Sequence, residues 1–211
     1  MELYFSPMSS SLAARAALYE TSADVRFIEV DRKTKRCSDG TDLRAIFPLA
    51  LVPLLRLDDG RLLSENVAIL QYIADRLPTA GLAPSSDLER LHLQQWLSFI
   101  ATEMHKAIFA PLLDANAPDG TRTHILKKFE PRLQYLNDHL TGREYLLDRF
   151  TVADAYLYTV LNWTMPTRVD LARWPAIKGY YEHLQIRPSI ARAFLEEMTL
   201  YKAELARQKP A

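Results

Sequence analysis

The stretch "LVPLLRLDDGRLLSE", residues 51–65, contains two short apolar runs on either side of Asp58-Asp59-Gly60. An Asp-Gly pair between apolar runs is a strong local signal for a β-hairpin. The segment from Asn66 to Leu77 follows directly, and its apolar residues recur at helical spacing. The stretch therefore predicts two antiparallel strands and then a helix.

The residues before this stretch alternate between strand and helix patterns. Leu3 and Phe5 have polar neighbours as in a strand, and Ser11 to Glu20 favours a helix. Val25 to Val30 is again β-branched and aromatic, and a short polar helix is predicted at Thr41 to Ile46. The order strand, helix, strand, helix, strand, strand, helix predicts an α/β domain over residues 1–77.

The composition changes at residues 78–86, where Pro, Ala, Gly and Ser are typical of a linker. Each later segment long enough to judge has a helical pattern, so residues 87–211 are predicted to form an all-helical domain. The predicted helices are Asp87 to about Pro111, Thr123 to Leu140 with a kink at Pro131, Thr151 to Trp163, Pro175 to Gln185 and Pro188 to Ala206.

The overall composition limits the possible partners. The 211 residues include 26 Lys plus Arg and 26 Asp plus Glu, so no net charge attracts nucleic acid or an anionic membrane. The first residues lack the basic and apolar regions of a secretory signal, and we expect a cytoplasmic protein with a small partner. The single cysteine, Cys37, has polar surroundings that predict an exposed thiol.

Three serines, Ser9 to Ser11, stand between a run ending in Pro7 and the first predicted helix. One serine is enough to cap a helix, so one interpretation is a cap with redundant polar neighbours. The alternative is an anion site, because the first turn of a helix presents free N–H groups and the positive end of its dipole. A hydroxyl there could also donate a hydrogen bond to a thiolate.

Ser64-Glu65-Asn66 occupies a second strand-to-helix junction. One interpretation is another helix cap, supplied by Ser64 or Asn66. The other is a site for the zwitterionic end of a peptide, whose carboxylate would meet the N–H groups of the helix and whose ammonium would meet Glu65.

Ser98, Thr102 and His105 share one face of the predicted long helix, and Lys106 lies four residues beyond Thr102. The opposite face is apolar. A polar stripe on an amphipathic helix is usually solvated, so the sequence leaves open whether this face belongs to a site. The chain has no Gly-rich phosphate loop, zinc-binding His-Glu-x-x-His pair or G-x-S-x-G elbow, and we expect no metal and no cofactor.

These residues belong to longer motifs, namely "LYFSP", "LVPLLRLDDGRLLSE", "VAILQYIADRLP", "WLSFIATEMHKAIFAPL" and "FTVADAYLYTVL". With these motifs in this order, the chain resembles a cytosolic glutathione transferase over essentially its whole length, and the bacterial beta class most closely. The resemblance implies a thioredoxin-like α/β domain, an all-helical domain and a homodimer. It implies an enzyme that transfers the thiolate of its co-substrate glutathione to a small hydrophobic electrophile.

The resemblance also assigns roles to individual residues. The catalytic residues would be Ser10, Ser11 and His105. The residues that bind glutathione would be Lys35, Leu51, Val52, Pro53, Glu65, Asn66 and Lys106. Among these, Pro53 would be a cis proline, the Val52 backbone would pair with the cysteinyl part, and Glu65 and Asn66 would hold the γ-glutamyl end. Ser98 and Thr102 would reach the site of the neighbouring subunit.

Two departures from the beta-class pattern modify this expectation. Where that class usually has Pro-Gly-Ala-Cys-Ser, the chain has residues 7–11 as Pro-Met-Ser-Ser-Ser, so Ser10 replaces the cysteine as in serine-type transferases. Where relatives tend to carry Lys-Gly-Gln, the loop before Val52 contains Leu49-Ala50-Leu51. The altered loop motivates one alternative, a binding or scaffold protein with little turnover. A glutathione-dependent isomerase or lyase is the other alternative.

Overall fold

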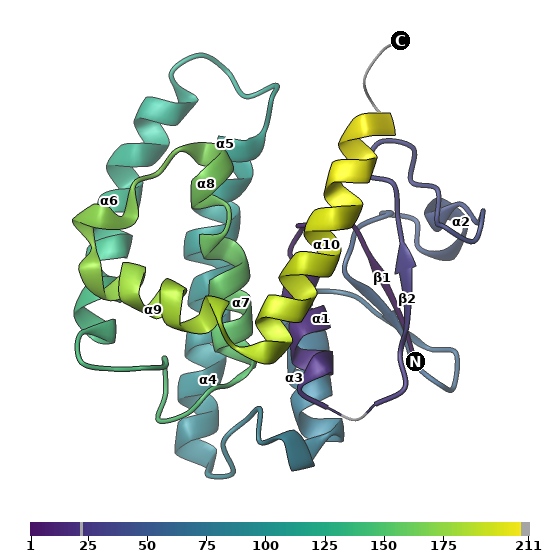
Figure 1. Ribbon diagram of the computed structural model, residues 1–211, viewed down its shortest axis with the longest axis horizontal. Helices are drawn as coiled ribbons and strands as arrows, with labels where there is room; N and C mark the ends of the chain where they lie inside the picture. Colours follow the sequence, from purple (N-terminus) through teal and green to yellow (C-terminus); the bar gives the residue numbers. More distant parts are fainter. Residues whose placement is uncertain (22, 208–211) are drawn as a thin grey trace. The chain divides into compact units, whose positions relative to one another are not determined.

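The computed structural model describes residues 1–21 and 23–207, which divide by their contacts into two compact units (Figure 1). The first unit comprises Met1–Ala80 together with the last helix, which begins at Pro188. The second unit comprises Gly81–Arg187. The boundary between Ala80 and Gly81 falls inside the segment that the composition indicates as a linker.

A four-stranded sheet in the order β2-β1-β3-β4 forms the centre of the first unit. Its strands are β1 (Glu2–Phe5), β2 (Arg26–Glu29), β3 (Leu54–Arg56) and β4 (Leu62–Leu63). β1 and β2 are parallel, whereas β3 pairs antiparallel with both β1 and β4. The predicted hairpin is therefore confirmed, and Gly60 has the positive φ, 85°, that its turn requires.

The helices of this unit connect and cover the sheet. α1 (Ser11–Tyr19) is the crossover between β1 and β2, because parallel strands need a connection that returns across the sheet. α1 and α3 (Asn66–Arg76) lie on one side of the sheet, and α2 (Leu43–Ile46) lies on the other (Figure 1). This order of strands and helices confirms the predicted α/β arrangement.

The α2 side of the sheet has its own apolar core, and this core contains the single cysteine. Its buried members are Tyr4, Ile28, Val30, Cys37, Leu43, Ala50 and Leu54. The prediction of an exposed Cys37 is wrong, since its side chain is only 5% exposed. The chain folds back so that Cys37 pairs with Val30 beyond the end of β2, which turns the thiol inward. Burial, assisted by Asp39, raises the pKa of this thiol.

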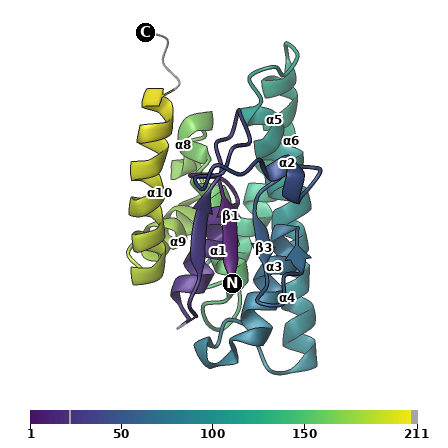
Figure 2. The ribbon, with the colours of Figure 1, turned by 90° about the vertical axis from the view of Figure 1, so that its right-hand side faces the viewer.

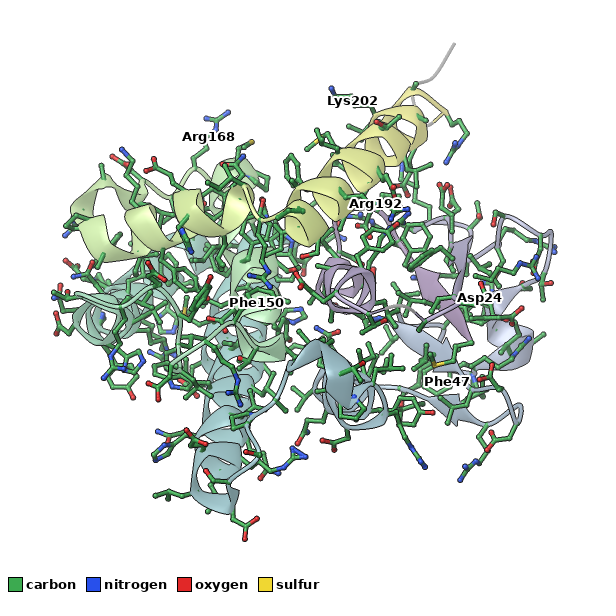
Figure 3. The ribbon with its side chains drawn as sticks, turned by 60° about the horizontal axis from the view of Figure 1, so that its bottom comes forward. Asp24, Phe47, Phe150, Arg168, Arg192 and Lys202 are labelled. Atoms are coloured by element: carbon green, nitrogen blue, oxygen red, sulfur yellow. The ribbon has the colours of Figure 1, made fainter. Side chains whose placement is uncertain are left out.

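The last helix, α10 (Pro188–Arg207), packs against α1 (Figure 2). The Arg15 guanidinium on α1 forms an ion pair of 2.7 Å with Glu196 on α10. Figure 3 shows Arg192 on α10 directed toward α1, where its guanidinium carbon lies 4.1 Å from the centre of the Tyr19 ring.

By these contacts α10 belongs to the first unit, whereas the predicted helical domain 87–211 includes it. An amphipathic pattern shows that one face of a helix is buried, but it does not show which element covers that face. For this reason the sequence pattern assigned the last helix to the helical domain, whereas its contacts assign it to the first unit.

The regular elements described in the second unit are helical, in agreement with the sequence patterns. They are α4 (Asp87–Phe99), η2 (Ile100–Phe109), α5 (Ala110–Leu113), α6 (Thr121–Leu140), α7 (Val152–Leu161), α8 (Thr164–Thr167), η3 (Leu171–Arg173) and α9 (Pro175–Gln185). A capping box of Thr151 and Asp154 starts α7. Over the described residues, no helix combines the length and the apolar character needed to cross a membrane.

Candidate active site

Three segments of the first unit meet at one end of the sheet. β1 leads into Ser9–Ser11 at this end, and Tyr4 pairs with Leu54. Since β3 runs antiparallel to β1, it begins at the same end, directly after Val52-Pro53. β4 runs antiparallel to β3, so it ends there, shortly before Glu65. The strand register thus brings together groups that are far apart in the sequence.

The serine cluster forms a tight loop at the start of α1. The hydroxyl oxygens of Ser9 and Ser11 are 2.7 Å apart, and the Ser11 hydroxyl donates to the Ser6 carbonyl at 3.2 Å. A hydroxyl has one proton to donate. Because the Ser11 proton goes to Ser6, the Ser9 proton goes to Ser11, and both remain within the loop.

Ser10 differs from its two neighbours. It is the N-cap residue of α1, yet its side chain makes no capping hydrogen bond. It is largely buried, and the first turn of α1 contains no acidic residue to neutralise the positive end of the helix dipole. The simple capping interpretation therefore does not account for the Ser10 hydroxyl.

The peptide bond between Val52 and Pro53 is cis, which confirms that expectation. Val52 precedes β3 and packs partly buried against the α2-side core. In the loop before it, the Leu49 and Leu51 side chains are 67% and 51% exposed. This part of the site therefore presents apolar side chains to solvent.

Glu65 and Asn66 lie at the N-terminus of α3. The N-cap residue is Glu65, whose side chain is exposed and makes no cap hydrogen bond. The Asn66 side chain is only 7% exposed, and neither polar atom of its amide has a hydrogen-bond partner in the described part of the chain. Leaving such a buried amide unpaired costs about 1–3 kcal/mol, so a ligand that pairs with it gains binding energy.

Lys35 lies in the loop after β2, where its backbone has a positive φ of 63° and its N–H donates to the Asp31 carbonyl at 2.9 Å. Its side chain is half-buried. The assignment of Lys35 to glutathione binding stays a prediction.

In the second unit, His105 lies on η2, a π-helical segment that continues α4. Its Nδ1 is 2.8 Å from the Tyr156 hydroxyl, and its ring stands edge-on to Trp163 with the centres 4.8 Å apart. Burial and, to a smaller extent, the Lys106 charge lower the pKa of His105 to about 4. His105 is therefore neutral at about pH 7 and acts as a hydrogen-bonding group rather than a cation.

The predicted polar stripe of the long helix is exposed except at His105. Ser98, Thr102 and Lys106 face solvent, and the Thr102 hydroxyl donates to the Ser98 carbonyl at 3.0 Å. The cross-subunit role of Ser98 and Thr102 stays a prediction. Across residues 1–21 and 23–207, no group of three or more His, Cys, Asp or Glu could hold a metal ion.

The sequence patterns do not single out two residues that make long-range contacts in the structure. Tyr156 is one of them, and its contact with His105 spans 51 residues. Glu197 is fully buried on α10 and accepts a hydrogen bond from the Met8 N–H at 2.7 Å, across 189 residues. One sequence signal could have found Glu197. It lies at helical spacing from the apolar residues Ile190 and Ala193, so the pattern places this acidic residue on the buried face of the helix.

The cis proline, the sheet order and the polar groups at two helix N-termini define a thioredoxin-like domain, here followed by a helical unit. Residues 1–75 match the model of the glutathione S-transferase N-terminal domain, and residues 110–183 match that of the C-terminal domain. The chain is 38% identical over 199 residues to glutathione S-transferase GstA of Escherichia coli O157:H7. The aligned region covers 93% of this chain and 98% of that protein.

Two solved structures are similar to this chain throughout. A sphingomonad glutathione S-transferase complexed with glutathione matches with a TM-score of 0.88 and 39% identity, over 93% of this chain and 98% of the other. The bacterial beta-class enzyme of Sphingomonas chungbukensis matches with a TM-score of 0.88 and 37% identity, over the same shares of the two chains. The chain belongs to the glutathione S-transferase family.

Proposed function

We propose that this protein transfers the thiolate of glutathione to a small hydrophobic electrophile. The observation that carries the proposal is the set of polar groups at one end of the sheet. These are the Ser10 hydroxyl, the exposed Glu65 carboxylate and the unpaired Asn66 amide. Glutathione offers complementary groups, namely a thiol, an ammonium and a carboxylate. Support comes from the relatives named glutathione S-transferase, one of them solved with glutathione.

Ser10 is the proposed donor to the thiolate, because the protons of Ser9 and Ser11 are engaged within the loop. Lowering a thiol pKa by about two units requires about 2.7 kcal/mol of preferential thiolate stabilisation. A hydrogen bond to a charged group contributes about 1.5–3 kcal/mol, and a helix N-terminus contributes about 0.3–1 kcal/mol. The two together are sufficient. Ser11 supports the loop rather than the thiolate in this proposal.

The remaining assignments concern the rest of glutathione. Glu65 pairs with the ammonium and Asn66 with the adjoining carboxylate, while the Val52 main chain, outside the strand ladder, pairs with the cysteinyl part. Leu51 and Pro53 flank that contact, and Lys35 and Lys106 supply positive charge for the glycyl carboxylate and the thiolate.

The helical unit is proposed to hold the electrophile, with neutral His105 as a hydrogen-bonding group held by Tyr156. Ser98 and Thr102 are proposed to serve the site of a second copy in a homodimer. The protein is proposed to act in the cytoplasm.

Retention on immobilised glutathione and turnover of a general aryl-halide substrate together test the function. We expect both for the wild type, and we expect Ser10→Ala to retain binding while losing most of its turnover. Binding without turnover would favour the binding or scaffold protein, which the exposed Leu49 and Leu51 also favour. A protein that neither binds glutathione nor turns over the substrate would contradict the proposal.

A further inference from the structure

Two carboxylates on α10 are buried, namely Glu197, which contacts the loop before α1, and Glu204, which contacts the loop after β2. Their side chains are 0% and 2% exposed. They are seven residues apart, which is about two helical turns, so they project from the same face of α10. Charged side chains are almost never buried in this way without a partner, so their contacts indicate what they do.

Glu197 binds the loop that carries the serines. Its Oε2 accepts the Met8 N–H at 2.7 Å. Met8 has a φ of 59°, a left-handed conformation that costs a residue with a side chain about 1–2 kcal/mol. Such a conformation persists only where the surroundings hold it. Ser9, Ser10 and Ser11 follow this turn directly, so its geometry sets where their hydroxyls point.

A second contact holds the same peptide group from its other side. The Arg32 side chain donates to the Pro7 carbonyl, which belongs to the peptide group that also contains the Met8 N–H. Arg32 is itself held by α10, because its N–H donates to Glu204 at 3.2 Å and its guanidinium lies over the Tyr201 ring at 5.7 Å. Both ends of this peptide group are therefore tied to α10.

The charged groups around Glu197 are Arg15 on α1, Arg32 after β2 and its neighbour Glu196. Arg15 NH1 is 3.9 Å from Glu197 Oε1, and neither atom has a hydrogen-bond partner in the described residues. Burial raises the pKa of Glu197 to about 8. Because a carboxyl group keeps an acceptor oxygen in either protonation state, the bond to Met8 does not require a charge.

We propose that Glu197 is a positioning residue for Ser10: by accepting the Met8 N–H, it holds the left-handed turn that orients the Ser10 hydroxyl toward the glutathione sulfur. This inference rests on the proposed function and deepens it. The residue lies on a helix outside both matched family domains, which cover residues 1–75 and 110–183.

Three variants separate positioning from simple packing. Glu197→Leu removes the acceptor, and Glu197→Gln retains it. The matched control is Glu196→Leu, because Glu196 also pairs with Arg15, whereas the acceptor of the Met8 N–H is Glu197. We expect Glu197→Leu to lower kcat about tenfold or more while the KM for glutathione changes less than about threefold, since thiolate stabilisation acts on the chemical step. The thiol pKa of bound glutathione, followed by thiolate absorbance, should rise by about one unit in this variant.

Glu197→Gln should restore kcat and the thiol pKa to near wild-type values, and Glu196→Leu should leave both unchanged. If Glu197→Leu lowers only the melting temperature, Glu197 is a packing residue and the inference is overturned. If the Leu variant does not fold, Glu197→Asp withdraws the oxygen by one methylene, and the same changes are expected at smaller size.

Hydrogen exchange in the absence of glutathione tests the hold on the loop independently of the reaction. The segment containing the Met8 amide should exchange faster in Glu197→Leu than in the wild type, Glu197→Gln or Glu196→Leu. Equal exchange in all four proteins overturns the inference. Faster exchange in the Leu variant, together with no thiolate signal in the wild type, would contradict the proposed function while supporting the hold of Glu197 on the loop.

Discussion

Substituting Glu197 with glutamine should change the pH dependence of stability in a direction that the structure specifies. The Glu197 side chain is fully buried, and burial raises its pKa from 4.5 to about 8 against the opposing effects of the Met8 N–H, Arg15 and Arg32. Glu196 beside it raises the pKa further. Glutamine cannot ionise, but it retains an oxygen that can accept the Met8 N–H. The variant therefore removes the titration of residue 197 and keeps this hydrogen bond.

The sign follows from proton binding in the two states. Between the unfolded pKa of 4.5 and the folded pKa of about 8, the folded chain keeps the Glu197 proton and the unfolded chain loses it. Stability is therefore greatest below the unfolded value and falls as the pH rises through this window, by up to about 1.4 kcal/mol per pH unit. The free energy of unfolding of Glu197→Gln, measured relative to the wild type, should rise across the same window.

Urea denaturation of both proteins at about pH 5 and about pH 8 measures this difference, because the contributions of the other groups cancel in the comparison. Glu196→Gln is the control. Partial burial raises the Glu196 pKa, but hydrogen bonds from Tyr19, Arg192 and Arg15 outweigh this and lower it. The stability that ionised Glu196 contributes is already complete above its unfolded pKa, so the control should show only a small trend, which comes from removing the Glu196 charge that adds to the raised pKa of Glu197. A constant offset between Glu197→Gln and the wild type at the two pH values would refute the reasoning.

Three further predictions concern the site. Glu65→Ala should weaken glutathione binding by about 1.5–3 kcal/mol in calorimetry, more than Ser10→Ala does, because it removes a charged partner; equal losses would make Glu65 purely structural. Ser10→Cys should rapidly form a glutathione adduct with oxidised glutathione in intact-mass measurements, whereas the wild type should react slowly because Cys37 is buried and its thiol pKa is raised; an inert new cysteine would contradict the placement of Ser10. Sedimentation at micromolar concentration should show a dimer, and a fully active monomer would remove the cross-subunit role of Thr102.

The sequence by itself determined the order of elements in this protein. Asp59-Gly60 between apolar runs predicted the β3–β4 hairpin, and the helical pattern that begins at Thr151 predicted α7. Such signals act between residues that are neighbours in the chain, so local propensity and hydrogen bonding are sufficient to produce them. Glu65 and Asn66 were recognisable for the same reason, as polar residues at a strand-to-helix junction.

Only the tertiary structure decided which polar groups remain available for a ligand. Polar neighbours predicted an exposed Cys37, yet the return of the chain onto Val30 buries it. The resemblance to the family named both Ser10 and Ser11, and only the structure shows that Ser9 and Ser11 are hydrogen-bonded within the loop whereas the Ser10 side chain makes no capping bond.

The contacts of α10 were also beyond the sequence. Its pattern shows a buried face, but the bond from Met8 to Glu197 spans 189 residues. The pairing of His105 with Tyr156 spans 51 residues in the second unit. Which groups meet across such separations depends on how whole elements pack. Burial of apolar surface is non-directional and lowers the free energy against any well-fitting apolar partner, so the sequence pattern of one helix does not specify which element covers it.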